Sequence, residues 1–95
     1  MTTLSPERVS FPLGRVLITS GAEEKLHPAE VIAALRRHAR GDWGELDPDD
    51  HAENQLALRE GLRLFSVYRD RYETRFYIIT EADRSVTTIL LPDEY

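Results

Sequence analysis

Three apolar segments in the last third of the chain decide the fold: LRLFSVY (residues 62–68), TRFYIIT (74–80) and SVTTILL (85–91). Each segment is short and rich in β-branched and aromatic residues, so each predicts a strand. The connections between the segments hold only a few residues, which is typical of hairpins. The sequence therefore predicts a three-stranded antiparallel meander at the C-terminal end of the chain.

Helical patterns precede these strands. Pro28 and Pro48 suit the first turn of a helix, where a missing N–H costs nothing, and Gly41 and Gly61 suit helix ends. The patterns predict helices that begin at these prolines, a short strand over residues 14–19, and one or two helical turns over 22–26. The expected fold class is α+β, with the N-terminal strand and two or three helices packed on the meander.

The length of 95 residues indicates one domain. We expect a flexible N-terminal arm over residues 1–12, where the pattern is weak, and a single α+β domain over residues 13–95. Helical spacing in the first half and alternation in the second half predict the core. Its expected members are Val16, Ile18, Ile32, Leu35, Trp43, Leu56, Leu64, Phe76, Ile78 and Ile89.

The composition excludes several classes of protein. The chain has no cysteine, which excludes a disulfide scaffold, a thiol nucleophile, an iron–sulfur cluster and a thiolate zinc site. The apolar runs are too short to cross a bilayer, and the first residues lack the features of a signal peptide. We therefore expect a soluble cytoplasmic protein with no membrane partner. His27, His38 and His51 lie in separate elements, so we expect neither a metal site nor a cofactor.

Negative charge is concentrated in one segment. The net charge is -5, and residues 41–60 hold seven acids against Arg59 alone. Such a cluster disfavours contact with nucleic acid, since phosphates require basic side chains, and it favours a basic protein partner. The alternative is an acidic helix start that only aids solubility. The candidate partner-binding residues are Asp42, Glu45, Asp47, Asp49, Asp50, Glu53 and Glu60.

The helix expected to begin at Pro48 arranges part of this charge on one side. At about 100° per residue, Asp49, Glu53 and Glu60 fall within about 40° of one another. We expect the apolar residues Ala52, Leu56, Leu58 and Leu62 to lie mostly on the other side. An acidic stripe of this kind can imitate a strand of phosphates. The alternative is an ordinary amphipathic helix whose outer face lies in water.

Several motifs resemble those of a family of small bacterial proteins. The similar segments are GDWGELD (residues 41–47), Asn54, ITEADRSVTT (79–88) and LPDEY (91–95). Members of that family are found largely on plasmids, phages and other mobile elements, under labels such as plasmid-related or restriction-neighbourhood protein. The resemblance covers roughly residues 11–95. It implies a genomic setting in which small acidic proteins often antagonise host defence, and it assigns no catalytic residue.

Charge and resemblance together suggest a function. We expect a mobile-element-encoded acidic binding protein that inhibits a host defence nuclease or surveillance complex, as anti-CRISPR and anti-restriction proteins do. It would present a phosphate-mimicking surface to a basic nucleic-acid-binding site. The partner is therefore a protein, with no direct contact to nucleic acid. The expected protein has no catalytic residues and is a monomer or a small homodimer.

Two alternatives stay open. One is an RNA-cleaving toxin of a toxin–antitoxin system with a ribonuclease-like α+β fold, although such toxins are generally basic because RNA is anionic. A ribonuclease needs a general base, a general acid and a cation. The candidate residues are His51, Arg63, Arg75, Tyr77, Arg84 and Thr87. The other alternative is a non-catalytic accessory protein.

Overall fold

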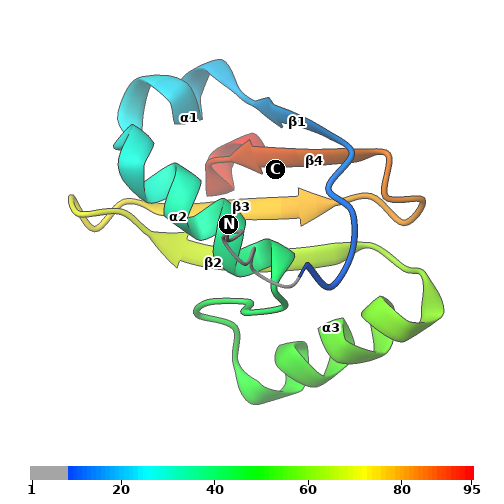
Figure 1. The fold of residues 1–95 in the computed structure, drawn as a ribbon. Coiled ribbons are helices and arrows are strands. Elements are labelled where there is room, and N and C mark those ends of the chain that lie inside the picture. Colours follow the sequence, from blue (N-terminus) through cyan, green and yellow to red (C-terminus); the bar gives the residue numbers. More distant parts are fainter. Residues whose placement is uncertain (1–8) are drawn as a thin grey trace, which may run out of the picture.

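The structure, a computed structural model, describes residues 9–95. Its elements, in chain order, are β1 (Arg15–Ile18), α1 (Ser20–Lys25), α2 (Pro28–Ala39), α3 (Pro48–Glu60), β2 (Leu64–Arg69), β3 (Arg75–Thr80), β4 (Val86–Leu90) and a 3-10 turn, η1 (Pro92–Glu94). The expected α+β class is confirmed (Figure 1). The four strands form one sheet in the order β1-β4-β3-β2. The sheet is mixed, because β1 runs parallel to β4 while the other neighbouring strands are antiparallel.

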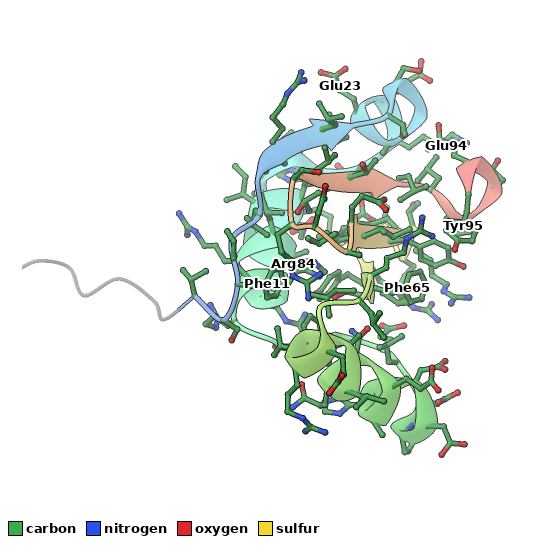
Figure 2. The ribbon with its side chains drawn as sticks, turned by 90° about the vertical axis from the view of Figure 1, so that its right-hand side faces the viewer. Phe11, Glu23, Phe65, Arg84, Glu94 and Tyr95 are labelled. Atoms are coloured by element: carbon green, nitrogen blue, oxygen red, sulfur yellow. The ribbon has the colours of Figure 1, made fainter. Side chains whose placement is uncertain are left out.

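One face of the sheet packs against helices. Register places Ile78 of β3 between Ser66 of β2 and Ile89 of β4, so these side chains share a face. Phe76, Ile78 and Ile89 are buried there with Ala22 of α1 and Ala34 of α2. On the opposite face lie η1, Phe65 and the C-terminal Tyr95, and no described helix covers it (Figure 2). The sheet therefore has one face that α-helices cover and one, called the open face below, that carries no α-helix, although Val67, Ile79 and Leu90 are buried on it.

The helix ends follow the expected signals. Asp47 caps α3 by accepting a hydrogen bond from the N–H of Asp50 at 2.9 Å, and Pro48 takes the first helical position. Gly61 ends α3 with φ of +74°, a left-handed conformation that favours glycine. His27 caps α2, because its Nδ1 accepts from the N–H of Ala29. The predicted starts at Pro28 and Pro48 are confirmed.

A second apolar cluster joins the loop after α2 to the helix α3. Trp43 is almost fully buried, and its indole N–H donates to Oε1 of Gln55 at 3.1 Å. Phe11 stacks on Trp43 with ring centroids 6.0 Å apart, and it is buried as well. Residues 1–8 of the expected flexible arm lie outside the described residues. The packed domain begins earlier than the expected boundary at residue 13, because Phe11 belongs to this cluster.

The predicted core is correct for Trp43 and for strands β2, β3 and β4, and it is wrong for β1 and for one residue each of α2 and α3. Trp43, Leu64, Phe76, Ile78 and Ile89 are buried, and Leu35 is partly buried. Four other predicted core residues are exposed, namely Val16, Ile18, Ile32 and Leu56. The strand β1 lies at the edge of the sheet, and all four of its residues are exposed. The helix α2 buries Ala34 and His38, so Ile32 lies to the side of its buried face.

The outer edge of β2 is covered by the chain itself. The N–H of Glu45 donates to the carbonyl of Val67 at 2.7 Å, and the N–H of Val67 donates to the carbonyl of Trp43. The Asn54 side chain accepts from the N–H of Phe65 and donates to its carbonyl, as a neighbouring strand would. This edge therefore has its backbone groups satisfied, which protects it from pairing with other chains.

Residues 43–45, called the covering segment below, require a glycine where they meet β2. Gly44 has φ of +74°, and a Cβ atom there would lie 2.0 Å from the carbonyl oxygen of Val67. We expect Gly44→Ala to lower the free energy of unfolding by about 2–3 kcal/mol, measured by urea denaturation. Gly61→Ala is the matched control, since Gly61 has the same φ but nothing within 4 Å of its added Cβ. Equal losses in both variants would contradict a role for the close approach.

Candidate functional site

The seven candidate acids divide into two groups, and the first group is paired inside the fold. The carboxylate of Asp42 accepts from Nε and Nη2 of Arg37 at 2.8 and 3.2 Å. These hydrogen bonds from Arg37 lower the pKa of Asp42 below its usual value. Oδ1 of Asp42 also accepts from the N–H of Gly44. Asp42 therefore holds the turn before β2's covering segment in place.

Two further acids of this group also interact with other parts of the fold. Oε1 of Glu45 lies 3.0 Å from Nε of Arg69, which joins the covering segment to the end of β2. The side chain of Asp47 caps α3, as described above. An ion pair or a cap reduces the charge that a carboxylate offers to a partner. Asp42, Glu45 and Asp47 thus each have a hydrogen-bond or ion-pair partner inside the fold, although all three remain exposed.

The second group lies on α3. The side chains of Asp49, Asp50, Glu53 and Glu60 are exposed. No basic side chain of residues 9–95 lies within ion-pair distance of any of the four. Within the described part of the chain, their charge has no ion-pair partner, and it gathers along one helix.

An apolar groove adjoins these acids. It has a volume of about 460 Å³ and lies between α3 and β2. Its wall includes Leu56 and Leu62, which are 46% and 52% exposed, together with Phe65 of the open face. Asp50 and Glu53 line the same groove, and so does Arg63, whose guanidinium pairs with Glu81. We define the α3 surface as the set Asp49, Asp50, Glu53, Leu56, Glu60 and Leu62.

The position of Leu56 differs from our expectation. We expected Leu56 on the apolar side of the helix, facing the core. It follows Glu53 by three residues and precedes Glu60 by four, so it belongs to the acidic stripe. Ala57 and Asn54 are the buried residues of α3 instead. The helical spacing contained this signal, and the stripe is mixed acidic and apolar rather than purely acidic.

The residues considered for ribonuclease chemistry do not gather at one place. The guanidinium of Arg84 donates to the carbonyls of Leu62 and Ala57, and Arg63 pairs with Glu81. Thr87 is fully buried. The remaining three are spread over α3 and β3: His51, Arg75 and Tyr77. Among the described residues this set offers no acid, base and cation around a common cavity.

Thr87 belongs to a buried polar chain around His38. Thr87 Oγ1 donates to the carbonyl of Leu13 at 2.7 Å, so it accepts from Thr80 Oγ1, which lies 2.7 Å away. Thr80 in turn accepts from Nε2 of His38 at 2.8 Å. The remaining nitrogen, Nδ1, accepts from the hydroxyl of Ser66. Every donor and acceptor is used if His38 is neutral with its proton on Nε2.

The surroundings of His38 favour that neutral form. The side chain is fully buried, and its ring meets Phe11 and Trp43 edge to face. Burial, aided by the charge of Arg84, lowers the pKa of His38 to about 3. With no exposed surface, His38 holds the core together and cannot meet a substrate.

Two features are absent from the described residues, namely a cluster of metal-ligating side chains and a membrane-spanning helix. Within residues 9–95, no three His, Asp or Glu side chains are arranged to hold a metal ion. Nor does this part of the chain contain a helix whose length and apolar character would let it cross a membrane.

Comparison with known proteins gives no match to a family model, a curated protein or a solved structure.

Proposed function

We propose that the protein is a non-catalytic binding protein that inhibits a partner through the α3 surface. The proposed partner is a protein with a basic nucleic-acid-binding surface, such as a host defence nuclease or surveillance complex. The observation that carries the proposal is the row of four exposed acids on α3, which have no basic partner within residues 9–95 and lie beside a partly apolar groove. By occupying the basic site, the protein would exclude the nucleic acid.

The two components of the α3 surface have different physical roles. Exposed carboxylates attract a basic partner over a distance and raise the association rate. Leu56, Leu62 and Phe65 offer apolar area, and burial of apolar area against a partner stabilises the complex. Arginine and lysine suit both parts, because their aliphatic stems cover apolar surface while their charged ends meet acids.

This mixed surface refines the idea of phosphate mimicry. A row of phosphates offers charge alone, whereas the α3 surface adds an apolar groove next to the charge. A partner that merely binds phosphates would gain nothing from the groove. The proposal therefore favours a basic surface that also presents apolar or long aliphatic side chains. The biological role that we propose, an antagonist of host defence, follows from the expected resemblance of residues 41–47, 79–88 and 91–95 to proteins of mobile elements.

The test is charge reversal on α3. We expect the triple variant Asp49→Lys, Glu53→Lys and Glu60→Lys to lose binding to the partner recovered from host lysate, while circular dichroism shows an unchanged fold. Glu53 and Glu60 are exposed, so each of their substitutions should change stability by no more than about 0.5 kcal/mol, whereas Asp49→Lys places a cation in the first turn of α3 and should cost about 1 kcal/mol. Binding of the wild type should weaken as salt rises, and added nucleic acid should compete for the same site on the partner.

A matched control separates the α3 surface from net charge. Glu24, Glu73 and Asp93 are exposed acids that lie outside α3. Their triple replacement by lysine gives the same net charge, and we expect it to retain binding. Equal loss in both triple variants would mean that only net charge matters. Full binding by the folded α3 variant would leave its acids a role in solubility alone.

A further inference from the structure

The two edges of the sheet differ. The outer edge of β2 is covered by residues 43–45 and by the side chain of Asn54. The strand β1 forms the other edge, and no other described segment pairs with its outer side. Natural proteins usually protect an exposed edge strand, because its free backbone groups can pair with another chain.

The hydrogen bonds between β1 and β4 show which backbone N–H and C=O groups of β1 face away from the sheet. The N–H of Arg15 donates to the carbonyl of Ser85, and the N–H of Thr19 donates to the carbonyl of Ile89, both on the β4 side. Alternate residues of a strand direct their backbone groups to opposite sides. The N–H and C=O groups of Val16 and Ile18 therefore point outward, away from the sheet.

This edge also carries exposed apolar side chains. Val16, Leu17 and Ile18 are 43%, 42% and 38% exposed, in a strand without lysine or proline. A groove of about 230 Å³ beside Ile18 continues the apolar surface to Ile32 of α2, which is 53% exposed. We define the β1 edge as Arg15, Val16, Leu17, Ile18 and Ile32.

We propose that the β1 edge binds a second copy of this chain, with the two β1 strands antiparallel about a two-fold axis at Leu17. In this register Val16 of each copy lies opposite Ile18 of the other, and both pairs exchange their outward N–H and C=O groups. Leu17 faces Leu17 of the other copy at a position without hydrogen bonds. The two sheets become one continuous sheet.

Charge complementarity supports a second copy of the chain as the partner of the β1 edge. It also supports an antiparallel pairing of the two β1 strands. The same register places Arg15 of one copy opposite Thr19 of the other, which is the cap of α1. Glu23 lies in the first turn of α1 and is exposed at the β1 edge of the molecule (Figure 2). Each copy thus offers a cation where the other offers an anion, twice per interface. A parallel pairing would instead bring the two Arg15 side chains together.

The proposed dimer is independent of the proposed function. β1 and α3 lie at opposite ends of the sheet (Figure 1). A dimer through β1 therefore leaves both α3 surfaces accessible, at the two far ends of the assembly. Two such surfaces would allow bivalent binding to a partner that is itself repeated.

The mass in solution provides the first test. We expect sedimentation or light scattering to show a dimer for the wild type. Leu17→Lys places two charges together on the axis and should halve the measured mass. Leu62→Lys is the control, because it makes the same change at another exposed leucine and should remain dimeric. A monomeric wild type, or a folded Leu17→Lys variant that stays dimeric, would overturn the proposal.

Cross-linking tests the register. The sequence contains no cysteine, so Leu17→Cys introduces a single thiol. Opposed positions without hydrogen bonds have Cα atoms about 4.5 Å apart, within the range of about 4.4–6.8 Å that a disulfide spans. Under mild oxidation we expect a disulfide-linked dimer of Leu17→Cys and no cross-link of the control Leu62→Cys. Absence of the first cross-link, or equal cross-linking of both variants, would refute the axis at Leu17.

Discussion

Replacement of Phe76 by alanine is expected to lower the free energy of unfolding by about 3–5 kcal/mol. Phe76 has no exposed surface and lies on the helix-covered face of β3. Its ring lies beside that of Tyr68, with centroids 5.8 Å apart, in the larger apolar cluster. Removing the ring leaves a cavity between the sheet and the helices, which can collapse only in part. Chemical denaturation of wild type and variant measures the difference.

Phe65→Ala is the control for this prediction. Phe65 is also a strand phenylalanine, but it lies half-buried on the open face of the sheet. Its truncation loses less buried area and leaves a dent that solvent can fill, so we expect a loss of about 1–2 kcal/mol. Equal losses for the two variants would contradict the assignment of one covered and one open face.

The helix limits could be predicted because their signals are local. Asp47, Pro48 and Gly61 each act on the backbone within one turn of their own position. The same holds for Pro28 at the start of α2. No contact with a distant part of the chain is needed to place these ends. Sequence patterns therefore predicted the elements well.

The burial of the first half could not be predicted in the same way. An apolar pattern shows which residues could be buried, but not whether another element covers them. Val16 and Ile18 have the alternation of a core strand, yet β1 lies at the edge of the sheet. The pairing of Glu45 with Arg69 is equally hidden, because these residues are 24 positions apart. The sequence thus located the acidic segment without showing which of its acids are paired.

The buried polar chain is the main feature that the sequence analysis missed. The sequence analysis gave His38 no place in the core, whereas it is fully buried. A signal was present in the strands. Ser66, Thr80 and Thr87 occupy positions on the same face as Leu64, Ile78 and Ile89, where an apolar residue is expected. Three polar residues at core positions require a buried polar partner, since unpaired groups there are costly.

This buried histidine makes the stability depend on pH. Burial lowers the pKa of His38 to about 3 in the folded state, from 6.5 in the unfolded chain. Below pH 6.5 the unfolded chain therefore binds a proton that the folded protein excludes. The free energy of unfolding is unaffected by His38 above pH 6.5, and it falls as the pH decreases from there toward 3.

Lowering the pH from 7 to 5 is expected to reduce the free energy of unfolding by about 2 kcal/mol, because each pH unit below 6.5 contributes about 1.36 kcal/mol. Urea denaturation at both pH values measures this loss.

His38→Gln is the control, since its amide can donate and accept hydrogen bonds but does not titrate. The variant should lose less than about 0.5 kcal/mol over the same interval, whatever its stability at pH 7. Carboxylates such as Asp42, whose pKa is lowered by its hydrogen bonds with Arg37, act below this interval. The same pH-dependent loss in wild type and variant would show that His38 is not the group responsible.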